Sequence, residues 1–241
     1  MRDAWSSGRA VRRSDGRFIG RVLIAIVIVL TTRPPDRLSA QAGHDPAHSP
    51  YSDIRRGPTL RLTEGYFGGS RGGLSVGASN GPTTGLRFEI QASSALIVAT
   101  GVSYANTTAF YRIAYDSSKR LVGPINNDLI LADFGLLLSL TGGKTWHGFQ
   151  PYVGATMGLA IGSRIGADTS QYNFGTKFTY APEAGLRWYP VKRLSAEIGG
   201  RLLVYHLSYP DSYHFYLLTP LAPLSETTIH PWATFGLAWT L

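Results

Sequence analysis

The sequence predicts an all-β protein, an eight-stranded antiparallel up-and-down β-barrel that crosses a membrane, with short periplasmic turns and long extracellular loops. Three observations support this prediction. The C-terminal stretch alternates between apolar and small or polar residues up to its last position, eight segments alternate in a similar way, and the connections between them are short and long in turn. Alternation with a period of two places one set of side chains on each face of a strand.

The C-terminal stretch is the most regular of these segments. From Ala233 to Leu241 the odd-numbered residues are mostly large and apolar, and the even-numbered ones are small or polar. The ends of a chain usually fray because terminal residues gain little from packing. A last strand that stays regular therefore indicates a closed sheet in which it pairs with the first strand, since lipid leaves no partner for an open sheet edge.

The eight segments divide the chain from residue 58 to residue 241 into strands and connections. The connections after the second, fourth and sixth segments are short, and the others are longer and rich in Gly, Ser, Asn, Asp and Pro. Short turns at one rim and longer loops at the other are typical of membrane barrels. We expect strands at about residues 59–68, 84–92, 95–106, 129–140, 150–162, 176–189, 194–207 and 229–241.

The first 42 residues are typical of a signal peptide. An arginine-rich segment precedes the apolar run from Val22 to Leu30, which is too short for a membrane helix, and Ala40-Gln41-Ala42 matches a cleavage pattern. We predict Sec-type export with cleavage near Ala42, followed by a periplasmic linker over residues 43–57. The exact cleavage position and the true start codon stay open.

Charge and cysteine content exclude several function classes. Residues 1–42 carry +5 of the net charge of +8, so the predicted mature chain is only weakly basic and we expect no nucleic-acid partner. The chain has no cysteine, which excludes disulfides and thiolate metal sites. His44 and His48 lie in the linker without further clustered ligands, and the glycine-rich stretch from Gly68 to Gly73 precedes no helix. We therefore expect no metal and no cofactor.

The polar face of the strands is expected to point into the barrel. Gly154, Gly158, Gly185 and Gly199 lie on this face, and an eight-stranded barrel leaves little room inside. In the first strand, Leu60, Leu62, Glu64 and Tyr66 all lie on the same face. Which face of this strand points into the barrel therefore stays open, and either Arg61 or Glu64 is a further interior charge. The other charges expected inside are Arg87, Glu89, Asp133, Lys177, Glu183, Arg187, Glu197 and Arg201.

These charges also predict the register of one hairpin. If Pro190 faces Leu194, then Arg187 lies opposite Glu197 and Glu183 lies opposite Arg201. A slip of one residue would turn the charges outward. Because an unpaired buried charge costs several kcal/mol, we expect an ion-pair network inside. A gated polar pore and a filled interior both fit this network, and the narrow interior of eight strands favours the filled one.

Aromatic residues cluster near the strand ends, as membrane interfaces require. We expect Trp146, Trp188 and Trp239 at one rim, and Tyr209, Tyr216 and Trp232 at the other. The aromatic stretch 209–218 is interpreted as an interfacial anchor in preference to a ligand or partner surface.

One pair of residues carries possible chemistry. His206 and Ser208 flank Leu207 and should both point outward. A histidine beside a serine can activate it as a nucleophile when a carboxylate orients the imidazole, and Glu226 is the nearby carboxylate. The pair resembles the motif of the outer-membrane lipid A deacylase family, but Tyr209-Pro210 stands where that family has Asn-Ala. We treat these residues as a weak alternative site.

From about residue 58 onward the chain resembles small bacterial outer-membrane β-barrels, such as the membrane domain of the outer membrane protein A family. The resemblance rests on strand count, loop alternation and the terminal strand. It implies an outer-membrane protein that the barrel-assembly machinery inserts and that contacts lipids including lipopolysaccharide, and we expect a monomer. It implies no activity.

The sequence thus predicts a non-enzymatic barrel with a structural, adhesive or minor-permeability role. Two alternatives stay open: a lipid A-modifying acyl hydrolase of the outer leaflet that uses His206 and Ser208, and a carrier that passes small hydrophobic molecules out through a lateral opening.

Overall fold

The computed structural model describes residues 49–112, 121–166, 168, 172–210 and 225–241. The chain divides into two units, residues 1–43 and 44–241, and every described residue belongs to the second. The predicted signal peptide, Tyr216 and most of the 209–218 stretch lie outside the described residues. Among the residues that are described, no helix is long and apolar enough to cross a membrane.

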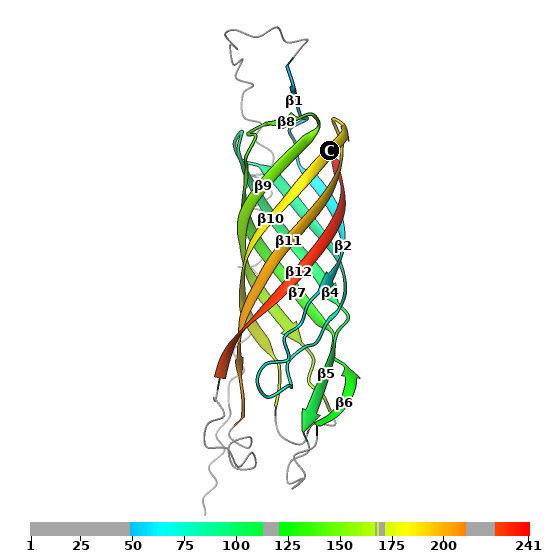
Figure 1. Ribbon diagram of the computed structural model, residues 1–241, viewed down its shortest axis with the longest axis vertical. Coiled ribbons are helices and arrows are strands. Elements are labelled where there is room, and N and C mark those ends of the chain that lie inside the picture. Colours follow the sequence, from blue (N-terminus) through cyan, green and yellow to red (C-terminus); the bar gives the residue numbers. More distant parts are fainter. Residues whose placement is uncertain (1–48, 113–120, 167, 169–171, 211–224) are drawn as a thin grey trace, which may run out of the picture. The chain divides into compact units, whose positions relative to one another are not determined.

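Eight antiparallel strands close into a barrel (Figure 1). The ring closes where the last strand pairs with the first barrel strand, from Trp232 opposite Phe67 to Thr240 opposite Thr59. This confirms the predicted fold class and the role of the C-terminal strand. In ring order the strands are β2 (Thr59–Phe67), β3 (Gly81–Gln91), β4 (Leu96–Ala105), β7 (Leu129–Ser139), β9 (Phe149–Gly162), β10 (Thr176–Val191), β11 (Leu194–Ser208) and β12 (Ser225–Thr240).

Four short strands were not predicted. Within the expected linker, β1 (Tyr51–Asp53) pairs with β8 (Lys144–Trp146), which lies between β7 and β9. Between β4 and β7, β5 (Thr108–Arg112) and β6 (Leu121–Asn126) form a separate two-stranded sheet. We call the rim that carries the β3–β4, β7–β9 and β10–β11 connections the turn end, and the opposite rim the loop end.

The apolar face of the barrel points outward. Leu159, Leu186 and Leu237 are 44%, 43% and 49% exposed. Glu183 and Arg201, on the other face, are only 5% and 8% exposed. The expected direction of the two faces is therefore confirmed. Small residues of the inner face leave room for larger side chains: a Cβ at Gly185 would lie 2.6 Å from Tyr152 Oη.

The first barrel strand follows the same rule. Leu60, Leu62 and Tyr66 are about half exposed, whereas Arg61 is fully buried inside the barrel. Glu64 stays on the exposed face, where its Oε2 accepts a hydrogen bond of 2.8 Å from Thr84 Oγ1. Of the two charges left open by the sequence, Arg61 is the interior one.

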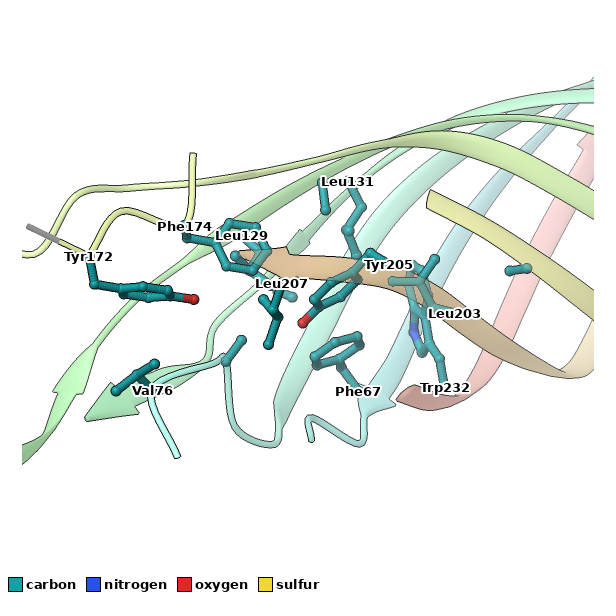
Figure 2. Close-up of a cluster of buried hydrophobic side chains, with 14 of the residues drawn as sticks. Phe67, Val76, Leu129, Leu131, Tyr172, Phe174, Leu203, Tyr205, Leu207 and Trp232 are labelled. Carbon is teal, nitrogen blue, oxygen red and sulfur yellow. The ribbon is translucent and has the colours of Figure 1, made fainter. Parts of the chain in front are cut away.

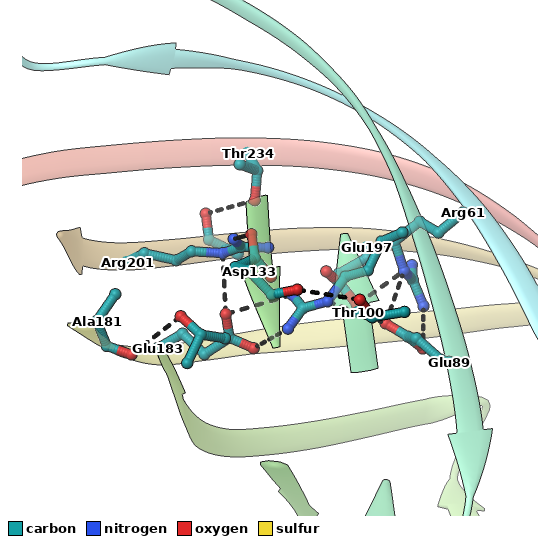
Figure 3. Close-up of polar contacts among 12 residues, drawn as sticks. Arg61, Glu89, Thr100, Asp133, Ala181, Glu183, Glu197, Arg201 and Thr234 are labelled. Atoms are coloured by element: carbon teal, nitrogen blue, oxygen red, sulfur yellow. Dashed lines mark hydrogen bonds and ion pairs between the residues drawn. The ribbon is translucent and has the colours of Figure 1, made fainter. Parts of the chain in front are cut away.

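The barrel interior contains two layers of different chemistry. The ionic layer lies toward the turn end and consists of Arg61, Arg87, Glu89, Asp133, Glu183, Arg187, Glu197 and Arg201 (Figure 3). The aromatic layer lies toward the loop end and includes Phe67, Leu129, Leu131, Tyr172, Phe174, Leu203, Tyr205, Leu207, Tyr209, Trp232 and the stacked His230 (Figure 2).

Candidate functional site

The ionic layer is balanced in charge. Its four arginines and four carboxylates come from inward positions of β2, β3, β7, β10 and β11, and none of their side chains is more than 10% exposed. Opposite charges at this depth must satisfy one another, because leaving one buried charge without its partner is strongly unfavourable. The geometry of the layer meets this requirement.

Four residues at the turn end of this layer form a closed ring of ion pairs. Arg61 lies 3.2 Å from both Glu89 and Glu197. Arg187 bridges the same two carboxylates, with its Nη2 2.9 Å from Glu89 and its Nε 2.7 Å from Glu197. Each charge of the ring therefore has two partners of opposite sign on neighbouring or facing strands.

A second set of contacts extends the network toward the middle of the barrel. Arg87 Nη2 lies 2.8 Å from Glu183 Oε1, and Arg87 Nε lies 3.8 Å from Glu89. Arg201 then joins the other oxygen of Glu183, at 2.9 Å, to Asp133, at 3.1 Å. The network thus reaches from β3 through β10 and β11 to β7, across the lumen.

The two charge pairs predicted for the β10–β11 hairpin are confirmed, but the turn differs from the expected one: a register shift between Trp188 and Val191 places Val191, and not Pro190, opposite Leu194. Arg187 pairs with Glu197 and Glu183 with Arg201 along these strands. Lys177 does not join the network: it lies at the loop end of β10, is partly exposed, and forms no ion pair within the described part of the chain. Parity placed it on the inner face, but it is six residues beyond Glu183 along the strand, too far toward the loop end.

The N-terminal segment covers the turn end of the lumen. β1 is joined through β8 to β9, and β9 lies opposite β2 in the ring of eight strands. Residues 54–58, which connect β1 to β2, must therefore cross the mouth of the barrel; we call them the strap. Ile54, Arg55 and Gly57 line a small recess together with Glu89 and Arg187, which are among its deeper residues.

The aromatic layer is centred on a histidine that sequence reasoning missed. His230 is fully buried between the rings of Phe67 and Tyr205, with centroid distances of 5.2 and 4.2 Å. Its Nδ1 accepts a hydrogen bond of 2.9 Å from Ser70 N, so the proton sits on Nε2, which donates to Thr228 Oγ1 at 2.7 Å. The even-numbered parity it shares with Thr234 could have identified it as an interior residue.

Two residues predicted at the membrane interface lie inside the barrel instead. Trp232 is 3% exposed, donates from Nε1 to Thr83 Oγ1 at 3.0 Å, and faces the Arg201 guanidinium at 4.9 Å. Tyr209 is also buried, and its hydroxyl donates to the Glu226 carboxylate. Burial and this hydrogen bond raise the pKa of Tyr209, which follows β11 outside the strands. Their aromatic character suggested the membrane interface, but both residues continue the alternation that places every second side chain inside the barrel.

The outward aromatics form two groups. Trp146, Trp188 and Trp239 are about half exposed near the turn end, where the sequence placed them. Near the loop end the outward aromatic residues include Tyr66, Tyr104 and Tyr180, which take the place expected for Tyr209 and Trp232.

The weak catalytic alternative is not assembled. His206 and Ser208 both point outward, and His206 Nδ1 lies 3.2 Å from Thr227 Oγ1. Glu226 pairs with Leu207 on the inner face and accepts a hydrogen bond of 2.7 Å from Gly73 N. Since its carboxylate lies on the opposite face of the sheet, it does not orient the imidazole. Among the described residues, no group of three His, Cys, Asp or Glu side chains could hold a metal ion.

Comparison with known proteins supports the fold. No family model and no curated protein matches the sequence. The structure is similar to Neisserial surface protein A (NspA), with a TM-score of 0.51 at 11% identity over 80% of this chain and 98% of that one. Two Pseudomonas aeruginosa structures, OprG and the N-terminal β-barrel domain of OprF, give TM-scores of 0.46 and 0.44 at 11% and 12% identity, over 78% and 77% of this chain and 98% of each of theirs. The chain has the fold of the small eight-stranded outer-membrane β-barrels.

Proposed function

We propose that this chain is a sealed, non-enzymatic β-barrel of the bacterial outer membrane that acts through its surfaces, in a structural or adhesive role. The outward apolar side chains support a membrane location, because a continuous apolar surface of this kind is unfavourable in water. In this arrangement the turn end faces the periplasm and the loop end faces outward.

The ionic layer is the observation that carries this proposal. Every arginine in it contacts two carboxylates, and the four positive and four negative charges cancel. A conducting barrel has a hydrated polar lumen. Here the charged groups bind one another across the lumen, the strap crosses one mouth, and the aromatic layer lies toward the other. Any permeability should therefore be minor.

Planar-bilayer recording tests the sealed interior. The full chain, refolded in detergent and added to a bilayer, should show no large stepwise conductance, and liposomes that contain it should not swell in small sugars. Protein run on a gel without boiling should migrate differently from boiled protein, which establishes that a folded barrel was tested. Large regular conductance steps from such a sample would contradict the proposal.

A second candidate, lateral passage of small hydrophobic molecules, is favoured by the aromatic layer. A molecule that enters from the loop end would meet apolar side chains and then be stopped by the ionic layer, so it would have to leave sideways. Uptake of an apolar fluorescent dye by cells separates the candidates. A carrier should lose uptake in Leu207→Trp, which fills the interior, and keep it in Ser208→Trp, on the outward face. A sealed barrel should give no uptake above background in any form.

The lipid A hydrolase alternative has its own test. Because Glu226 faces away from His206, expression of the chain should leave the mass of lipid A unchanged. A loss of acyl chains that disappears in Ser208→Ala, with the unboiled barrel still folded, would restore this alternative.

A further inference from the structure

The turn end carries a set of basic side chains that the ionic layer does not use. None of them forms an ion pair with another described residue, and all but partly buried Lys144 are exposed. The acidic side chain at the same end is Asp53, which pairs along the backbone with Lys144. We call this set the basic rim: Arg55, Arg56, Lys144, Lys192 and Arg193.

Apart from Arg55, which lines the recess at the mouth of the barrel, the members of the basic rim follow one continuous part of the barrel edge. The Arg56 guanidinium covers Gly143, where an added Cβ would lie 2.8 Å from Arg56 Nη2, so the strap brings this charge beside Lys144. The β8–β9 turn is joined to β10 by a hydrogen bond of 2.8 Å from Tyr189 N to Gly148 O. β10 then leads directly into the Lys192–Arg193 turn.

Tryptophans place this rim at the depth of lipid headgroups. Trp239 pairs with Leu194, the residue that follows Arg193, and Trp146 lies two residues from Lys144. Both indoles are about half exposed on the outer face. Trp rings at a barrel end mark the boundary between acyl chains and headgroups. Lys and Arg can lay their alkyl stems along apolar surface and hold their charge at that boundary.

We propose that the basic rim binds the phosphates of anionic phospholipids, such as phosphatidylglycerol, in the leaflet that faces the periplasm. This rests on the membrane location proposed above. Guanidinium groups bind phosphate oxygens through paired hydrogen bonds, and lysine adds a further positive charge. The four edge residues Arg56, Lys144, Lys192 and Arg193, less Asp53, bring three net positive charges to the anionic headgroups, whereas a zwitterionic headgroup brings its own cation and gains less. A basic side chain near an anionic lipid surface strengthens binding roughly fivefold.

Native mass spectrometry of the full chain in detergent tests the proposal, with phosphatidylglycerol and phosphatidylethanolamine as the two probes. The double variant Lys192→Gln/Arg193→Gln should retain phosphatidylglycerol about 25-fold more weakly, at roughly fivefold for each charge removed, with phosphatidylethanolamine unchanged. The matched control Arg71→Gln/Arg164→Gln removes two exposed positive charges near the loop end and should retain both lipids as the unmodified chain does.

Three results would overturn the proposal: equal losses in the two double variants, equal retention of the two lipids by the unmodified chain, or lipid retention that Lys192→Gln/Arg193→Gln leaves intact. If that variant instead lost cosedimentation with isolated peptidoglycan while its lipid retention stayed intact, the basic rim would bind the cell wall and not lipid. Gel mobility of unboiled protein and cell fractionation report the folded barrel and its location separately, so failure here is distinct from failure of the proposed function.

Discussion

The two layers of the barrel interior fill the same narrow space with different kinds of side chain. Toward the turn end, eight charged groups fill the space and each is held by at least one partner of opposite sign within 3.2 Å. Toward the loop end, aromatic and aliphatic side chains fill it, and the one central polar ring, His230, is hydrogen-bonded and stacked. The difference implies that the ionic layer is sensitive to the loss of one partner, and the aromatic layer to the loss of volume.

The residue between the layers belongs to both. Trp232 lies under the Arg201 guanidinium on one side and meets the Phe67 ring edge-on, at a centroid distance of 6.4 Å, on the other. The four predictions below test the contrast between the layers, from the largest expected effect to the smallest.

Glu89→Gln should be the most disruptive single change in the interior. Glu89 contacts Arg61, Arg87 and Arg187, so loss of its charge leaves the buried layer with a net positive charge. Breaking a buried ion pair from one side costs about 3–5 kcal/mol. The free energy of unfolding, from urea titration of the refolded barrel followed by gel mobility, should fall by about that amount.

Glu64→Gln is the matched control, because it makes the same change on the outward face of the neighbouring strand. Glu64 contacts only a hydroxyl, Thr84 Oγ1, among the described polar groups. The urea midpoint should therefore shift much less. Similar losses in the two variants would mean that the ionic layer does not depend on pairing.

A double-mutant cycle on Arg187 and Glu197 measures the pairing directly. Their side chains meet at 2.7 Å and both are buried. Arg187→Gln and Glu197→Gln should each destabilise the barrel, and the double variant should lose less than the sum, with a coupling of about 1–3 kcal/mol. Additive losses would show that the two charges act independently.

Trp232→Phe probes the boundary between the layers. The smaller ring would leave Thr83 Oγ1 without its donor and open a space beside Arg201. We expect the free energy of unfolding to drop by about 1–3 kcal/mol, since a buried polar group loses its partner. Trp239→Phe, on the exposed face at the turn end, is the control and should have a smaller effect; the reverse order would mean that Trp232 is not an interior residue.

Period-two alternation was enough to predict the barrel and the facing of most strands. It also predicted the Glu183–Arg201 pairing, because opposite charges on one face fit a single register. The prediction failed where residue type was given more weight than this alternation. Trp232 and Tyr209 were assigned to the interface because they are aromatic, although their positions alternate with the inward set.

Other features could not be predicted from the sequence, because they depend on the position of a residue along the barrel axis and on contacts between distant segments. Lys177 has inward parity but lies beyond the network along the strand. β1 is three residues long and pairs with β8 about ninety positions away, so no local pattern indicates it. The strap across the mouth of the barrel follows from that pairing.

Tyr205→Phe should have the smallest effect, and it tests whether volume alone decides stability in the aromatic layer. The Tyr205 ring is buried against His230, but its hydroxyl forms no hydrogen bond with any described residue. Removing a buried hydroxyl without a partner relieves its desolvation, so stability should stay the same or rise by up to about 1 kcal/mol. Tyr209→Phe makes the same change where the hydroxyl does bind Glu226, and should lower stability by about 1 kcal/mol. If Tyr205→Phe were the more damaging of the two, the Tyr205 hydroxyl would have a partner in the folded protein. The aromatic layer would then depend on polar pairing as the ionic layer does, and the contrast between the two layers would not hold.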